Sequence, residues 1–120
     1  MKFFLDTYAL IEIVKGNQKF QRYLESDAIT LKDNLAELYY YLLRLYGENF
    51  ANDALEKFSS IATEYPIGII PKSMSFKHTN HKTKFSYIDC IGYTYALESK
   101  RFFLTGDRAF GGMKNVEIVR

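Results

Sequence analysis

Short apolar stretches typical of strands alternate with helical stretches along this chain, and this alternation restricts its fold more than any other feature. The expected strands are "KFFL" at 2–5, "AITL" at 28–31, the apolar run at 67–70 between two prolines, "RFFLT" at 101–105 and "VEIV" at 116–119. No hairpin signal joins two of them. Strands that alternate with helices form βαβ units and pair in parallel. We therefore predict an α/β protein, a three-layer α/β/α sandwich whose central, mostly parallel sheet has about five strands.

Helical spacing of apolar residues fills the intervals between these strands. The predicted helices cover 7–16, 18–25, 34–46, 49–61 and 86–99. Gly16 ends the first helix and Gly47 ends the third. A chain of 120 residues with no linker or repeat matches one domain, so we expect residues 1–120 to share one core.

Composition narrows the class of protein further. A hydrophobic fraction of 48% is typical of a globular chain and excludes a disordered one. Cys90 is the only cysteine, which rules out an intramolecular disulfide and fits a reducing compartment. Asp6 and Glu12 interrupt the apolar N-terminal stretch too early for a signal peptide. No run reaches the ~18 uncharged apolar residues of a membrane span. We expect a soluble, cytoplasmic protein with no membrane partner.

Two carboxylates stand where predicted strands end. Asp6 follows "KFFL" directly, and Asp107 follows "FFLT" after one glycine. Parallel strands end at one edge of their sheet, and open α/β sheets bind ligands beyond that edge. The two carboxylates are therefore candidate site residues. The alternative interpretation is structural, because aspartate commonly caps helices and forms turns at such junctions.

A third carboxylate lies on an apolar side of a predicted helix. Asp89 shares that side with Phe85 and Ala96 at helical spacing. A buried carboxylate needs a cation or hydrogen-bond donors, since desolvation of an unpaired charge costs several kcal/mol. A cation site and a structural ion pair with lysine or arginine both satisfy this need.

Glu37 is less clearly marked by its pattern. It shares a polar stripe with Asp33 and Arg44, which a solvated helix face explains. It also lies in the first turns of a helix that follows the strand at 28–31, so it could approach the same edge of the sheet. Periodicity leaves both interpretations open.

The segment from 65 to 88 has no acidic residue. Its cations are Lys72, Lys77, Lys82 and Lys84, with His78 and His81. Such a segment is either a solvated stretch or a surface that contacts phosphates. The two histidines are best interpreted as a surface pair, because the chain has no other histidine to complete a zinc site.

Four segments, in this order and at these separations, resemble the PIN domain, in particular the toxins of VapBC toxin–antitoxin pairs. The segments are "FFLDTYALIEI", "NLAELYYYL", "FSYIDCIGYTYALE" and "FFLTGDRAF". The resemblance covers essentially the whole chain. It implies four acids around Mg²⁺ or Mn²⁺ that hydrolyse RNA, which by position are Asp6, Glu37, Asp89 and Asp107. Thr105 matches the hydroxyl residue that supports the last acid.

The chemistry agrees with this implication. Hard divalent cations prefer oxygen ligands, and four carboxylates in one pocket would repel each other without a metal. We expect RNA phosphates to be held by Arg108 and by lysines of the basic segment, namely Lys72, Lys82 and Lys84. The resemblance further implies an antitoxin protein partner and a homodimer. The alternatives are a catalytically inactive PIN-like module that binds RNA or protein, and a receiver-like domain phosphorylated on a strand-end aspartate.

Overall fold

A computed structural model describes residues 1–120, and its centre is one five-stranded sheet. The strands are β1 (Lys2–Leu5), β2 (Asp27–Leu31), β3 (Ala62–Thr63), β4 (Phe102–Thr105) and β5 (Val116–Ile118). Their order across the sheet is β3-β2-β1-β4-β5, and every neighbouring pair is parallel. The parallel α/β architecture is confirmed.

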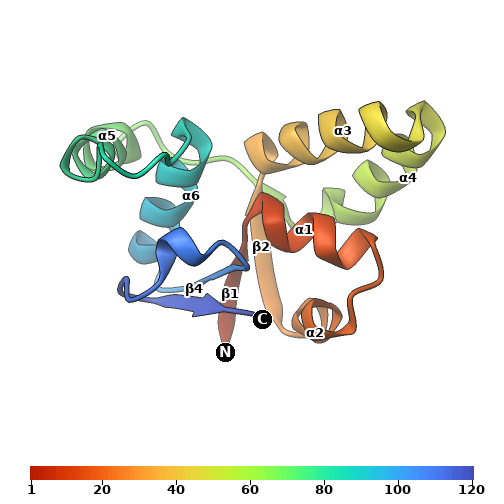
Figure 1. Cartoon of the computed structure of the whole chain (residues 1–120), viewed down its shortest axis with the longest axis horizontal. Coiled ribbons are helices and arrows are strands. Elements are labelled where there is room, and N and C mark those ends of the chain that lie inside the picture. The colour runs from red at the N-terminus through yellow and green to blue at the C-terminus, as the bar shows by residue number, and fades with distance from the viewer.

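Helices cover both faces of this sheet, as Figure 1 shows. One face packs against α1 (Thr7–Val14), α2 (Gln18–Gln21), α3 (Lys32–Tyr46) and α4 (Glu48–Phe58). The other face packs against α5 (Ile69–Thr79) and α6 (Tyr87–Glu98). Three single-turn 3₁₀ helices are η1 (Arg22–Glu25), η2 (Ser59–Ile61) and η3 (Arg108–Phe110). The three-layer α/β/α sandwich is therefore confirmed.

The alternation of side chains along the strands builds two cores. Phe3 and Leu5 of β1 join the core under α1 to α4, whereas Phe4 between them joins the core under α5 and α6. Phe4 stacks on Phe103 of β4, with ring centroids 5.7 Å apart and an interplanar angle of 10°. Full burial of a side chain of this size contributes roughly 1.5–3 kcal/mol, so both faces of the central strands are strongly stabilised.

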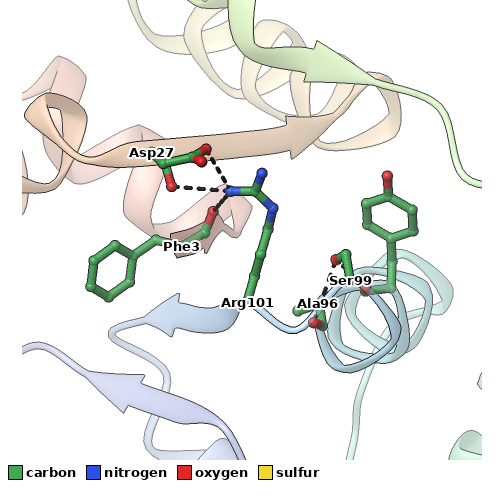
Figure 2. Close-up of polar contacts among 6 residues, drawn as sticks. Phe3, Asp27, Ala96, Ser99 and Arg101 are labelled. Atoms are coloured by element: carbon green, nitrogen blue, oxygen red, sulfur yellow. Dashed lines mark hydrogen bonds and ion pairs between the residues drawn. The ribbon is translucent and has the colours of Figure 1, made fainter. Parts of the chain in front are cut away.

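Arg101 fixes the edge of the sheet at which strands β1, β2 and β4 begin (Figure 2). Its Nη1 donates to the carbonyl of Phe3 at 3.3 Å, and to the carbonyl and Oδ1 of Asp27 at 3.0 and 2.9 Å. Its backbone N–H donates to the carbonyl of Ala96 near the end of α6, at 2.9 Å. The Arg101 side chain is 13% exposed. One guanidinium thus ties three strands together at the edge opposite Asp6 and Asp107.

The strand predicted at 67–70 is wrong. The third strand is the two-residue β3, and Ile69 begins α5. Pro71 is the third residue of that helix, where a backbone N–H has no intrahelical acceptor and its loss costs little. Pro66 and Pro71 flank the apolar residues at 67–70, and this made the start of a helix resemble a short strand that ends at prolines. The part of the basic segment from Ile69 to Thr79 is therefore helical.

No helix of the chain is both long enough and apolar enough to cross a bilayer.

The strand order has a switch at the β1–β4 pair. The chain continues outward from β1 to β2 on one side and from β4 to β5 on the other. In open parallel sheets the crevice for ligands forms at such a switch, beyond the carboxyl ends of the strands. Asp6 directly follows β1, and Gly106 and Asp107 directly follow β4. The fold therefore brings these two segments to the place where an open α/β sheet binds its ligand.

Candidate active site

The two strand-end aspartates are both caps. Asp6 is the N-cap of α1, and its Oδ1 accepts from the backbone N–H of Ala9 at 2.8 Å. Asp107 caps η3 and accepts from the backbone N–H of Ala109 at 2.9 Å. The backbone N–H of Asp6 also donates to the carbonyl of Leu104 in β4, at 3.2 Å, which joins the two segments. Capping uses one oxygen of each carboxylate, so it does not exclude a second role.

Asp89 occupies the third position of α6 and forms a capping box with Ser86. Its Oδ2 accepts from the backbone N–H of Ser86, and the Ser86 hydroxyl oxygen accepts from the backbone N–H of Asp89, both at 3.0 Å. No lysine or arginine forms an ion pair with Asp89. The structural ion pair considered for this residue is therefore absent. The second oxygens of Asp89 and Asp107 accept no hydrogen bond within the chain.

Glu37 is held by two residues that the sequence did not single out. The hydroxyl of Thr7 donates to Glu37 Oε1 at 2.5 Å, and Asn34 Nδ2 donates to the Thr7 hydroxyl at 3.0 Å. Asn34 is 2% exposed, and its Oδ1 has no hydrogen-bond partner. Two signals were present in the sequence: Thr7 adjoins Asp6, and Asn34 precedes Glu37 by three residues on the same side of one helix. This hydrogen-bonded chain turns Glu37 toward the start of α1.

Burial and mutual repulsion perturb the carboxylates. Asp6 is 4% exposed, and its pKa is raised to about 7, with burial as the largest cause. The charges of Asp89 and Asp107 contribute to this rise in the pKa of Asp6, whereas the nearby Thr105 hydroxyl and the Ala9 N–H oppose it. Glu37 is half-buried; burial is the largest cause of its raised pKa, to which the charge of Asp89 adds. All four acids are thus coupled: Asp6 to Asp89 and Asp107, and Glu37 to Asp89.

No cation of the protein compensates this cluster. None of the four acids takes part in any of the ion pairs of the chain. Thr105, which is fully buried, adds a hydroxyl beside Asp6 and accepts from the backbone N–H of Asp107 at 3.0 Å. The donor set is carboxylate and hydroxyl oxygen, which suits Mg²⁺ or Mn²⁺. No three acidic side chains converge closely enough to hold an ion in the conformation described. The chemistry of the donors fits the metal, and their function as ligands stays a prediction.

The residues predicted to hold RNA phosphates occupy different environments. Lys72 lies on α5 and forms an ion pair with Glu98 of α6. Lys82 and Lys84 are exposed in the loop before α6 and form no ion pair, and Arg108 is exposed beside Asp107. Lys82, Lys84 and Arg108 are therefore available to a ligand, and Lys72 is already engaged.

Solved structures of other proteins share this architecture. A chain of the VapBC2 complex from Rickettsia felis, solved with a DNA fragment from its promoter, superposes with a TM-score of 0.79 at 15% identity, covering 98% of this chain and 97% of that one. The sarcin–ricin loop cleaving toxin VapC20 from Mycobacterium tuberculosis gives 0.75 at 16% identity, covering 96% and 98%. A chain of a toxin–antitoxin complex from Klebsiella pneumoniae gives 0.74 at 18% identity, covering 96% and 95%.

The chain has the VapC-type PIN fold. The resemblance noted in the sequence is thereby confirmed at the level of fold. No family model matches the sequence, and no curated protein matches it by sequence comparison. The fold is shared with these structures at sequence identities of only 15–18%.

Proposed function

We propose that this protein is a metal-dependent endoribonuclease that hydrolyses RNA phosphodiester bonds and acts as the toxin of a toxin–antitoxin pair. The observation that supports this most directly is the coupled set of Asp6, Glu37, Asp89 and Asp107 at the switch in strand order, without a basic counter-ion. Such a set is unfavourable by itself and becomes favourable with a divalent cation. The architecture shared with VapC20, a toxin that cleaves the sarcin–ricin loop, supports the choice of RNA.

Each acid has a proposed function within this reaction. Asp6, Asp89 and Asp107 would supply most ligands to Mg²⁺ or Mn²⁺. A metal bound there would lower the pKa of a water and offset the charge of the phosphodiester. Glu37 would contribute to a second metal or orient the attacking water. The Thr105 hydroxyl would support both acids, because it lies beside the Asp6 carboxylate and accepts from the backbone N–H of Asp107.

Partners follow from the same proposal. One of the similar structures is a toxin–antitoxin complex and another is VapBC2 bound to promoter DNA, which supports an antitoxin as the partner of this chain. We extend the proposal to a homodimer in the cytoplasm. Light scattering of the purified protein at several concentrations tests the dimer, and a constant monomer mass would contradict it.

A second candidate is the inactive module, in which the PIN fold binds RNA or protein without cleavage. The presence of four acids without cations disfavours this candidate, since a binding surface for RNA gains nothing from them. The receiver-like alternative no longer applies. Receiver domains have the strand order 2-1-3-4-5, whereas this sheet has β3-β2-β1-β4-β5.

Calorimetric titration of Mn²⁺ into metal-free protein tests the proposal without knowledge of the RNA. We expect binding in the parent and its loss in Asp89→Asn, with thermal unfolding preserved. Asp53→Asn is the matched control, because Asp53 is an exposed aspartate on α4 outside the cluster. Cleavage of total RNA, compared among the three proteins with and without EDTA, then separates the nuclease from the inactive module. Metal binding without RNA cleavage would favour the inactive PIN-like module. No Mn²⁺ binding in the parent would overturn both the proposed metal site and the proposed ribonuclease reaction.

A further inference from the structure

A groove of about 510 Å³ runs between α2 with η1 and the chain from Glu117 to Arg120. We call it the α2 groove. Lys19, Arg22 and Arg120 line it; all three are exposed and none forms an ion pair. Its one acid is Glu117, whose Oε2 accepts from the Tyr23 hydroxyl at 2.8 Å. The groove therefore presents a net positive surface, unlike the acidic cluster.

Two contacts connect the α2 groove to the candidate active site. The backbone N–H of Val119, which lines the groove, donates to the carbonyl of Thr105 at 3.0 Å. Behind the other wall, Phe20 of α2 is buried next to the lining residue Lys19 and packs on Tyr8, with ring centroids 6.1 Å apart. The groove thus begins next to the segment that leads to Asp107.

Tyr8 lies between the groove and the acids. Its ring rests on Gly106, where a Cβ would come within 2.2 Å of a ring carbon. Only glycine leaves room for the ring at this position, directly before Asp107. Tyr8 is nevertheless 46% exposed. Gly106 and Phe20 fix the ring, and the remainder of the tyrosine is open to a ligand beside the acidic cluster.

We propose that the α2 groove and Tyr8 form the track along which single-stranded RNA leaves the active site. In this arrangement a nucleobase next to the cleaved bond stacks on Tyr8, and the following phosphates lie against Lys19 and Arg120. A fixed aromatic ring followed by a positive groove is the combination that binds single strands, since stacking is worth roughly 1–3 kcal/mol per base and cations follow the backbone. The inference rests on the proposed ribonuclease function and adds its substrate path.

This path differs from the one expected from the sequence. Lys82 and Lys84 precede α6 on the other face of the sheet, whereas the α2 groove lies on the face of α1 and α2. The two predictions can therefore be separated by substitutions on either side of the acids.

Fluorescence anisotropy of a 5′-fluorescein ten-nucleotide oligouridine tests the groove, with all variants built on Asp89→Asn to keep the RNA intact. We expect Lys19→Ala with Arg120→Ala to weaken binding roughly fivefold at 50 mM salt, and to reduce the slope of log affinity against log salt by about 1.4. Lys57→Ala is the matched control, because Lys57 is an exposed cation of α4 that does not line the groove.

An oligomer of the same length made of abasic ribose phosphates tests the stacking. We expect Tyr8→Ala to weaken oligouridine binding about fivefold to tenfold and to leave abasic binding unchanged, while Tyr8→Phe stays within twofold of the parent. Tyr40→Ala is the control, since Tyr40 is 64% exposed on α3, away from Gly106. Unfolding temperatures of all variants are compared first, and Tyr8→Leu replaces Tyr8→Ala if the latter unfolds.

Three outcomes are decisive. Loss of affinity in the groove and Tyr8 variants supports the track. Loss only in Lys82→Ala and Lys84→Ala overturns it and leaves the ribonuclease intact, because RNA would then lie along the α6 side. Failure of the parent to bind or cut any RNA overturns the track and the proposed function together.

Discussion

The hydroxyl of Thr7 donates to the carboxylate of Glu37 at 2.5 Å, although the two residues are thirty positions apart. Asn34, on the same helix as Glu37, donates to that hydroxyl in turn. Thr7 can accept from one neighbour and donate to the other because a hydroxyl does both. The first turn of α1 thereby orients two acids: Asp6 by its cap and Glu37 through Thr7.

Thr7→Val should disturb Glu37 without emptying the space that Thr7 fills. The bond from Thr7 lowers the pKa of Glu37, so its loss should raise that pKa further. We expect Mn²⁺ affinity to fall about ten- to hundredfold, the usual effect of removing a partner of a metal ligand. Calorimetry measures this, and Thr7→Ser should restore most of the affinity. Equal affinity in Thr7→Val and the parent would contradict Glu37 as a metal ligand and leave it the function of orienting the attacking water.

Asp6→Asn should stabilise the metal-free protein at neutral pH. The folded-state pKa of Asp6 is about 7, against 3.8 for the free group. The folded state therefore binds the proton more tightly, and its stability falls as pH rises from about 4 to 7. Asparagine keeps the cap to Ala9 and has no charge to desolvate. We expect a gain on the order of 4 kcal/mol above pH 7, since one pKa unit is worth about 1.4 kcal/mol.

Urea unfolding at pH 4 and pH 8, in EDTA, measures this difference. The gain should be present at pH 8 and small at pH 4. A gain that does not depend on pH would contradict the burial of an ionised Asp6.

Mn²⁺ should raise the stability of the parent by mass action. At a concentration one hundred times Kd the expected gain is about 2.7 kcal/mol, because the ion binds only the folded state. Asp107→Asn should abolish most of this gain while it retains the cap to Ala109. Thermal unfolding with and without Mn²⁺ provides the measurement. The same shift in both proteins would place the ion elsewhere.

Arg101→Met should destabilise the fold and leave the active site unchanged. The substitution removes the donor shared by Phe3 and Asp27 at the edge of the sheet opposite Asp6. The bond from Arg101 lowers the pKa of Asp27, so this carboxylate adds stability above its ordinary pKa of 3.8 that is lost as pH falls below it. We expect a lower unfolding temperature at pH 7, a smaller difference at pH 3, and unchanged Mn²⁺ affinity. A change in Mn²⁺ affinity would contradict the view that Arg101 and the acids act independently at opposite edges of the sheet.

The local sequence was sufficient to predict that strands and helices alternate along the chain. Apolar runs such as "KFFL" and "RFFLT" have few alternatives to buried strands, and Gly16 and Gly47 end helices by their backbone freedom. The exception is the segment at 67–70, where Pro71 in the first turn of a helix resembles a strand boundary. A local pattern cannot distinguish a proline in the first turn of a helix from a proline at the end of a strand. Proline has no backbone N–H, and neither position needs one for a hydrogen bond.

Residue types and their spacing are local properties, and they were enough to predict the α/β class, the resemblance to PIN domains and the four candidate acids. The folded chain was needed to show that Asp6, Asp89 and Asp107 have no cationic partner, that Thr7 and Asn34 hold Glu37, and that Tyr8 rests on Gly106. These relationships join residues far apart in the chain. They depend on the order in which strands pair and on the packing of α1 against α3 and β4, which no local pattern contains.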